Sequence, residues 1–245
     1  MKLQGTWDLF LDIVYPRDIR CDICSAKRDD ILNHGVCEDC ESRLPFIEPP
    51  VCPKCGKMML ADNKLCSDCE KISHAFYKGI SIFEFSAEVK RLIHRYKYKG
   101  EKQLSIPMIH WMTEALKYCR WDFDTIVSVP LYPTRERERG FNQAGLLAKG
   151  LSGNMGVVLA NKTLFRVKDT PHQARLGRQE RLQNLMDAFE VRKMNDSSKV
   201  FQGKTILLVD DVYTTGSTVD QCARVLLESG AKGVYVITLA TGSNF

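Results

Sequence analysis

From about residue 74 to the C-terminus, apolar segments with strand-like spacing alternate with segments whose apolar residues recur at helical spacing. Helices are predicted over Ala87–Tyr98, Ile106–Cys119, Gln143–Leu151 and Ser217–Ser229. Strands, the first with a hairpin as its alternative, are predicted over Phe76–Phe85, Thr125–Val129, Val157–Phe165, Ala188–Val191, Thr205–Val209 and Val234–Leu239. Alternating strands and helices predict an α/β fold with a doubly wound, mostly parallel sheet over residues 73–245.

The first 16 residues carry apolar side chains at helical spacing and predict a short amphipathic helix over residues 1–16. This helix either packs on the protein's own surface or docks on a membrane surface or a partner. A secretory signal is excluded because Asp8 and Asp12 interrupt its apolar region, and no apolar run reaches the ~20 residues of a membrane-spanning helix. The sequence therefore predicts a cytoplasmic protein without an integral membrane segment, with peripheral attachment through this helix as an alternative.

Eight of the ten cysteines form four Cys-x-x-Cys pairs, all before residue 70. Each Cys-x-x-Cys turn directs two thiolates at one point, and two such turns about a dozen residues apart can close a tetrahedral site. Residues 17–72 are therefore predicted to form a double zinc ribbon, a small domain with two structural zinc ions. The predicted ligands are Cys21, Cys24, Cys37, Cys40, Cys52, Cys55, Cys66 and Cys69. Sequential and interleaved pairing of the turns are both compatible with the spacing.

Disulfides or redox-active thiols are the alternative for these pairs, and the absence of a secretion signal disfavours them. The two remaining cysteines, Cys119 and Cys222, lie on predicted helices and are expected in the core. A hydrophobic content of 44% and a charged content of 27% are ordinary for a soluble globular protein. The net charge of +5 suits an anionic ligand, but solubility alone explains it.

The segment Ile206–Thr218 carries the strongest functional signal. Four apolar residues predict a buried strand, and Asp210 and Asp211 follow at its carboxyl end, where open α/β sheets bind ligands. The hydroxyl-rich turn after them precedes a helix, so its N–H groups can surround a phosphate, and Gly216 permits close approach. Adjacent carboxylates would repel a phosphate unless a sugar lies between them. A ribose phosphate meets this requirement, and Mg²⁺ would offset the charge of a pyrophosphate group.

This segment resembles the signature of type I phosphoribosyltransferases for 5-phosphoribosyl-1-pyrophosphate (PRPP). The resemblance implies a site for PRPP or ribose 5-phosphate with magnesium. Catalysis would depend on Asp210 and Asp211, which hold the ribose hydroxyls, while the 5′-phosphate is bound by Thr214, Thr215, Gly216, Ser217 and Thr218. The 6-oxopurine enzymes have an aspartate at the position of Thr214, so hypoxanthine and guanine are disfavoured as acceptors.

Two further segments are predicted to complete the site. The turn after the strand at Thr125–Val129 is followed by basic residues that suit a pyrophosphate, and the substrate-binding residues expected here are Pro130, Leu131, Arg135 and Arg139. Glutamates alternate with these arginines, so a solvated charged loop is the alternative. The long polar stretch from Arg166 to Asp187 is expected to act as a lid.

The order of motifs along the chain narrows the resemblance to the competence protein F (ComF) family. The shared motifs are the cysteine pairs, Tyr98-Lys99-Gly100, Val129-Pro130-Leu131, Arg139–Gln143, Thr170–Ala174 and the acidic pair. The resemblance covers nearly the whole chain. It implies a phosphoribosyltransferase-like domain and a role in bacterial natural transformation, in which imported single-stranded DNA is handled beside a helicase-like competence protein.

The predicted helix Ala87–Tyr98 and the residues after it mix basic and aromatic side chains, as surfaces that track single-stranded DNA do. The candidate DNA contacts are Lys90, Arg95, Lys97 and Lys99. A solvated helix face is the alternative. The sequence is compatible with an enzyme that transfers the phosphoribosyl group to an unidentified acceptor, and with a non-catalytic adaptor that binds PRPP and DNA.

Overall fold

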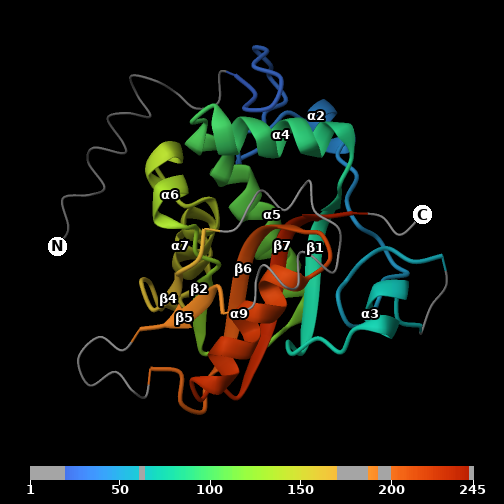
Figure 1. The fold of residues 1–245 in the computed structure, drawn as a ribbon. Coiled ribbons are helices and arrows are strands. Elements are labelled where there is room, and N and C mark those ends of the chain that lie inside the picture. Colours follow the sequence, from blue (N-terminus) through green and yellow to red (C-terminus); the bar gives the residue numbers. More distant parts are fainter. Residues whose placement is uncertain (1–19, 61–63, 170–186, 193–199, 243–245) are drawn as a thin grey trace.

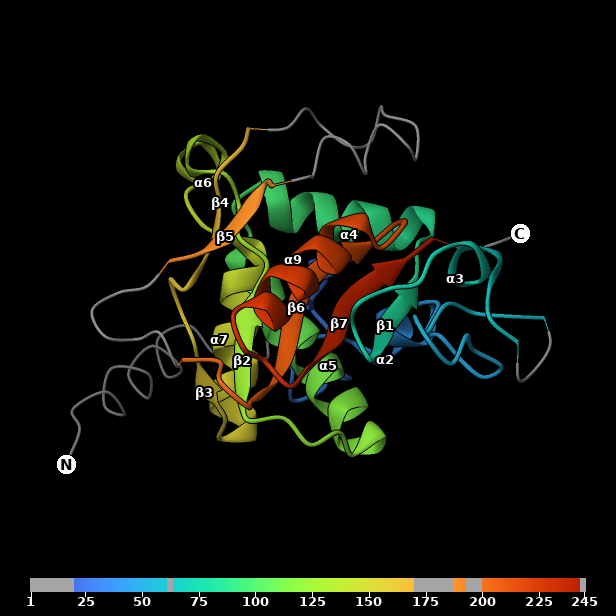
Figure 2. The same cartoon turned by 60° about the horizontal axis from the view of Figure 1, so that its bottom comes forward.

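In the part of the chain that the structure describes, the central sheet has five strands, all parallel, in the order β1-β7-β6-β2-β3 (Figures 1 and 2). The computed structural model describes residues 20–60, 64–169, 187–192 and 200–242, so the predicted helix over 1–16 and most of the predicted lid lie outside the described residues. The strands are β1 (Lys78–Glu84), β2 (Thr125–Ser128), β3 (Val158–Leu159), β6 (Thr205–Tyr213) and β7 (Gly233–Thr241). The predicted parallel α/β fold is confirmed.

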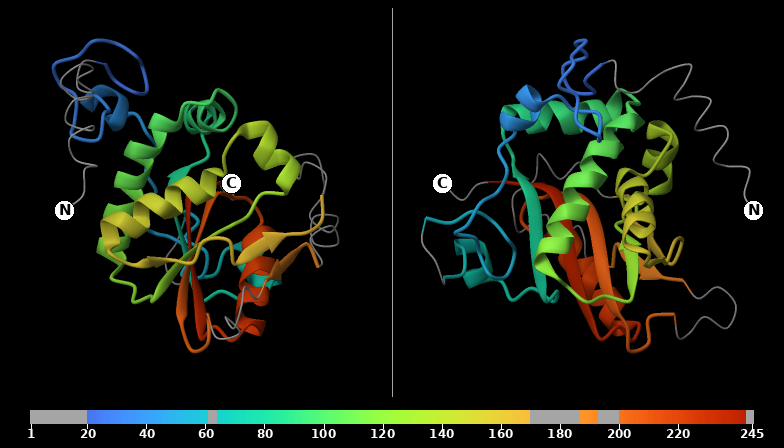
Figure 3. Two further views of the ribbon diagram at one scale, coloured as in Figure 1. Left: turned by 90° about the vertical axis from the view of Figure 1, so that its left-hand side faces the viewer. Right: turned by 180° about the vertical axis from the view of Figure 1, so that it is seen from behind.

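Helices cover both faces of the sheet, as Figures 2 and 3 show. One face packs against α5 (Ser105–Cys119) and α7 (Gln143–Met155), and the other against α9 (Ser217–Glu228). Alternate residues of β6 serve the two layers: Leu207 packs in the α5/α7 core and Leu208 in the α9 core. Strands buried on both faces require such continuous apolar runs. Cys222 is fully buried in the α9 core as expected, whereas Cys119 is only half-buried.

A further helix, α4 (Ala87–Tyr98), lies across the carboxyl ends of the strands (Figure 1). Its first turn is capped by Ser86, whose side chain accepts a hydrogen bond of 3.2 Å from the backbone N–H of Val89. A short 3₁₀ turn, η2 (Lys102–Leu104), then leads into α5. In the described parts of the chain, no helix combines the length and apolarity that crossing a bilayer requires.

Two predicted elements differ from the structure. The predicted strand Val157–Phe165 is wrong, because the chain turns at Lys162, which has φ +57°, and forms two short strands instead of one. The second, β4 (Leu164–Arg166), pairs antiparallel with β5 (Phe189–Val191) outside the main sheet. The charged segment after the β2 turn is not a loop but the helix α6 (Pro133–Arg139), which has proline at its start and Gly140 at its end.

The eight paired cysteines form two separate clusters, and the turns pair sequentially. Within each cluster the four sulfur atoms lie within 4.8 Å of one another. The Sγ atoms of Cys24 and Cys37 are 4.0 Å apart and those of Cys55 and Cys66 are 3.6 Å apart. Four thiolates at about 2.3 Å from a zinc ion would be separated by roughly 3.8 Å, whereas a disulfide requires about 2.05 Å. The clusters therefore fit zinc and do not fit disulfides.

Backbone N–H groups support these thiolates. The N–H of Cys37 points at the sulfur of Cys21, and the N–H of Cys66 points at that of Cys52, both at 3.4 Å. Burial alone would raise the pKa of the Cys21 thiol, but hydrogen bonds from neighbouring backbone groups outweigh it and lower the pKa to about 7. The short helices α2 (Glu38–Ser42) and α3 (Ser67–Lys71) each carry the last ligand of a cluster.

We expect the purified protein to contain two zinc ions per chain and to lose stability when they are removed. The reason is that the cysteine-rich segment has few apolar residues, so metal binding, worth on the order of 10 kcal/mol per structural site, stabilises its fold. The measurements are metal content and the thermal unfolding midpoint before and after chelation. Cys119→Ser, outside both clusters, is the matched control and should retain both ions. Unchanged unfolding after complete zinc removal would contradict the assignment.

Candidate functional site

A cleft of about 400 Å³ opens at the carboxyl ends of β2 and β6, beneath α4. It brings together residues from distant parts of the chain, and the lining includes the following predicted ligand residues: Pro130, Leu131, Arg135, Arg139, Asp210, Asp211, Thr214 and Thr218. Of the other three predicted residues, Thr215 and Gly216 belong to the turn that joins β6 to α9, and Ser217 is the first residue of α9. The parallel sheet explains this convergence, because the carboxyl ends of its strands meet at one edge.

Asp210 and Asp211 lie within β6, which continues past the predicted strand end to Tyr213 because it keeps its pairing with β7. The N–H of Asp211 donates to Oδ1 of Asp210 at 2.8 Å. Burial, and second the charge of Asp211, raise the pKa of Asp210 to about 7. Nζ of Lys97 from α4 lies 2.7 Å from Oδ2 of Asp211 and offsets part of the negative charge.

The turn between β6 and α9 has the geometry of an anion site. Gly216 has φ +78° and precedes the first residue of α9, so the N–H groups of the helix start lie just beyond it. The side chains of Thr215 and Ser217 share a hydrogen bond of 2.8 Å. A Cβ atom on Gly216 would lie 2.3 Å from the hydroxyl of Tyr213, so only glycine fits there.

Basic side chains form the opposite side of the cleft. Arg135 and Arg139 come from α6, and Arg135 lies 3.3 Å from the carboxylate of Asp169. Arg139 stacks on the Tyr98 ring, 4.8 Å from its centroid, and donates 3.0 Å hydrogen bonds to the Tyr98 hydroxyl and to Oε1 of Gln143. These contacts hold Arg139 in place between α4 and α7.

Arg166 is a cleft residue that sequence reasoning missed. It ends β4, is almost fully buried and lines the same cleft as Asp210. Burial, and second the positive charge of Arg135, lower the pKa of the Arg166 guanidinium, while the Asp210 carboxylate acts in the opposite direction. An arginine at the end of an apolar strand is a detectable signal, but the predicted strand stopped at Phe165 and left Arg166 in the polar loop.

The four candidate DNA contacts do not form one exposed surface. Arg95 donates to the carbonyls of Ile23 and Asp22 at 2.6 and 2.8 Å and pairs with Glu101, so it joins α4 to the first cysteine cluster. Lys97 pairs with Asp211 inside the cleft. Both side chains therefore already have partners within the protein.

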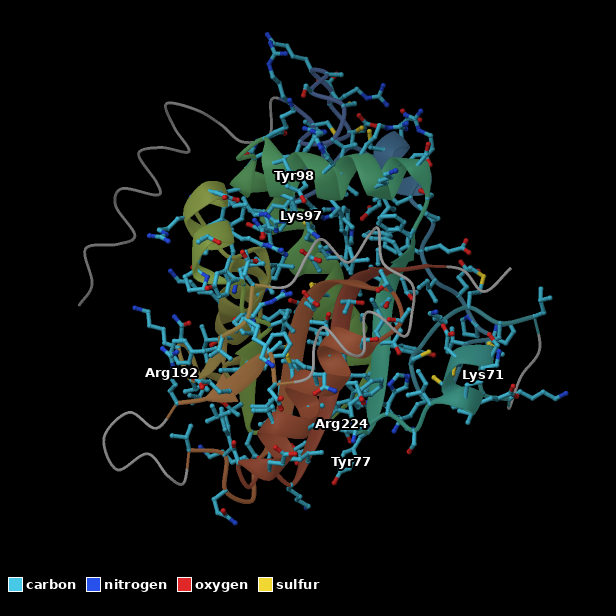
Figure 4. All side chains as sticks on the ribbon, in the orientation of Figure 1. Lys71, Tyr77, Lys97, Tyr98, Arg192 and Arg224 are labelled. Atoms are coloured by element: carbon cyan, nitrogen blue, oxygen red, sulfur yellow. The ribbon has the colours of Figure 1, made fainter. Side chains whose placement is uncertain are left out.

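Lys90 and Lys99 remain exposed, with Lys90 at the cleft rim. Of the two tyrosines near this set, Tyr96 is buried and donates to the carbonyl of Gln143 at 3.0 Å, whereas Tyr98 is 51% exposed. Figure 4 shows Lys97 and Tyr98 where α4 crosses above the sheet.

Comparison with known proteins matches both parts of the chain. Residues 10–70 match the double zinc ribbon domain family, and residues 110–244 match the phosphoribosyl transferase domain family. Competence protein ComFC of Streptococcus pneumoniae is 32% identical over 240 residues, which cover 90% of this chain and 99% of that protein.

Two further relatives align with most of the chain. Competence protein F of Haemophilus influenzae is 29% identical over 91% of this chain and 97% of that protein. DNA utilization protein YhgH of Salmonella typhimurium is 30% identical over 84% of this chain and 90% of that protein. The chain belongs to the competence protein F family, with a double zinc ribbon followed by a phosphoribosyl transferase domain.

Proposed function

We propose that this protein binds PRPP or ribose 5-phosphate with magnesium in the cleft beneath α4. The observation that carries the proposal is the convergence of three groups on one cleft: the carboxylates of Asp210 and Asp211, the turn at Gly216 and the arginines of α6 and β4. A sugar phosphate is complementary to this arrangement. Its hydroxyls donate to carboxylates, and its phosphate accepts from the N–H groups of the helix start.

The arginine side of the cleft suits a pyrophosphate group. Arg135, Arg139 and Arg166 line it opposite the acidic pair, and guanidinium groups bind phosphate oxygens through paired hydrogen bonds. Asp210 and Asp211 are the residues that would hold a magnesium ion, which would supply charge neutralisation for the pyrophosphate. Lys97 pairs with Asp211, so this carboxylate would repel the anion less. The binding energy would therefore come from both ends of the ligand.

The same residues could support transfer of the phosphoribosyl group. When the bond between C1 and the pyrophosphate breaks, positive charge develops on the ribose and negative charge on the leaving group. In the proposed complex the acidic pair would face the sugar and the arginines would face the leaving group, which would favour this separation of charge. The alternative is a non-catalytic adaptor that binds the same ligand without turnover.

For the cellular role we propose natural transformation in the cytoplasm, with handling of imported single-stranded DNA beside a helicase-like competence protein. The proposal is supported by relatives named competence protein and DNA utilization protein. The cysteine clusters also suit a reducing compartment. Tyr98, Lys90 and Lys99 are exposed aromatic and basic residues near the cleft that would contact the strand.

Calorimetric titration of PRPP with magnesium into the zinc-loaded protein should show binding, and Asp210→Asn or Asp211→Asn should weaken it by at least about tenfold, because each removes a charged acceptor. Asp122→Asn, an exposed position in the segment after α5, is the matched control and should bind as the unaltered protein does. Absence of binding by the unaltered protein would reject the proposal. Pyrophosphate release in the presence of nucleobases or single-stranded DNA would then distinguish the enzyme from the adaptor.

Asp210 should make the stability of the ligand-free protein depend on pH. Its pKa is raised to about 7, above the ~3.9 of an unfolded chain, so its neutral form is accommodated at low pH and stability is lost as the pH rises through 7. Asp210→Asn should therefore raise the thermal unfolding midpoint at pH 8 by about 5 °C and leave it nearly unchanged at pH 4. An equal effect at both pH values would show that the carboxyl is not held neutral.

Single-stranded DNA affinity should fall with salt, because lysine contacts release counterions from the phosphates. Replacing Lys90 and Lys99 together by alanine should reduce the slope of log affinity against log salt by about 1.4, since each lost phosphate contact accounts for about 0.7 on a single strand. Replacing Lys78, at the amino end of β1, and Lys117, on α5, together by alanine is the control with the same change of charge. An unchanged slope in the double variant would exclude these lysines as DNA contacts.

A further inference from the structure

The turn at Gly216 rests on two buried side chains, Tyr213 and His74. A Cβ at Gly216 would lie 2.3 Å from the Tyr213 hydroxyl and 2.9 Å from Cε1 of His74, so both groups lie directly against the glycine. The Tyr213 hydroxyl and Nε2 of His74 are 3.3 Å apart. Tyr213 is 2% and His74 5% exposed, so neither reaches a ligand in the cleft.

Asp220 connects this pair to the first turn of α9. Its side chain is buried, and Oδ1 accepts the backbone N–H of Ala75 at 2.6 Å and lies 3.5 Å from Nδ1 of His74. The N–H of Asp220 donates to the carbonyl of Gly216 at 2.8 Å. Arg224 adds a hydrogen bond of 3.1 Å to Oδ2. Asp220 thus holds the start of α9 against the segment that contains His74 and Ala75.

The same group of side chains extends to the second cysteine cluster. Lys57, which lies between the two Cys-x-x-Cys turns of that cluster, is buried, pairs with Asp68 at 2.6 Å and lies 5.8 Å from the centre of the Tyr213 ring. Phe76 stacks on His74 at 4.9 Å and meets the Tyr213 ring edge-on at 6.4 Å. The four cysteines of this cluster share one core with Phe76, Tyr213 and the buried face of α9.

The first cluster contacts a different part of the site. Its residues Asp22 and Ile23 accept hydrogen bonds from Arg95 of α4, two residues before the Lys97 that pairs with Asp211. The two cysteine clusters therefore contact different parts of the cleft, the first through α4 and the second through the turn at Gly216.

We propose that the second zinc ribbon sets the conformation of the phosphate-binding turn, with Tyr213, His74 and Asp220 as positioning residues. The inference rests on the function proposed above for that turn. A glycine at positive φ has wide conformational freedom, and a phosphate is bound only when successive N–H groups converge on it. The buried side chains beneath Gly216 restrict this freedom before any ligand arrives, so less ordering is needed on binding.

The first test removes single interactions and leaves the zinc ligands intact. Tyr213→Phe, His74→Gln and Lys57→Met should each weaken ribose 5-phosphate binding by about three- to tenfold, with two zinc ions retained. Tyr77→Phe is the matched control, because it also removes a tyrosine hydroxyl hydrogen bond, here of 2.6 Å to the carbonyl of Lys232, at the opposite end of the sheet. Affinity equal to that of the unaltered protein in all three variants would overturn the inference while the proposed function stands.

The second test needs no ligand and so separates the inference from the proposed function. Hydrogen exchange of residues 214–220 is compared in Cys66→Ser, which removes a ligand of the second zinc site, and Cys24→Ser, which removes one of the first. Cys66→Ser should speed exchange in this turn by about fivefold or more, and Cys24→Ser should act on α4 instead. Equal effects of the two variants on the turn would overturn the inference. Lys57→Met, which keeps both zinc sites, decides the result if Cys66→Ser does not fold.

Discussion

The cleft is organised around two neighbouring carboxylates in a strand that is buried on both faces. Unpaired, Asp210 and Asp211 would repel each other and any anion near them, and burial increases that cost. In the structure this repulsion is reduced in three ways: Lys97 pairs with Asp211, the pKa of Asp210 is raised, and arginines line the same cleft. The groups that offset the acids come from α4, α6 and β4, so the charge of one strand end explains why these separate elements have to meet.

The scaffold places those elements accurately because most of them are short and begin or end at the same edge of the sheet. β1 leads directly into α4, β2 into α6 and β6 into α9. Each connection lies at the carboxyl end of its strand, so small shifts of the sheet would move all three together. The zinc ribbons add a second layer of constraint, since one contacts α4 and the other the floor of the turn.

The parallel fold, the two cysteine clusters and the acidic pair beside its turn could be predicted from the sequence. Each of them depends on the spacing of residue types along a short stretch of the chain. The break at Lys162 was not visible, since apolar residues on both sides of it extend the strand pattern. Helix α6 was missed because none of its residues is buried and so no apolar face marks it. The true partners of Arg95 and Lys97 come from other segments, and helical spacing alone does not identify such partners.

The cysteine-rich segment also forms backbone hydrogen bonds with the outer edge of β1. Edge strands expose unpaired backbone groups that can recruit another chain. Here the N–H groups of Gly79 and Glu84 donate to the carbonyls of Lys54 and Pro45, and the carbonyl of Ile82 accepts the N–H of Ile47. The opposite edge strand, β3, has only two residues. The cysteine-rich segment therefore also covers the exposed edge of β1 and hinders edge-to-edge association. In a chain that has lost its metal, this edge would be open to pairing with another chain, and the protein would aggregate.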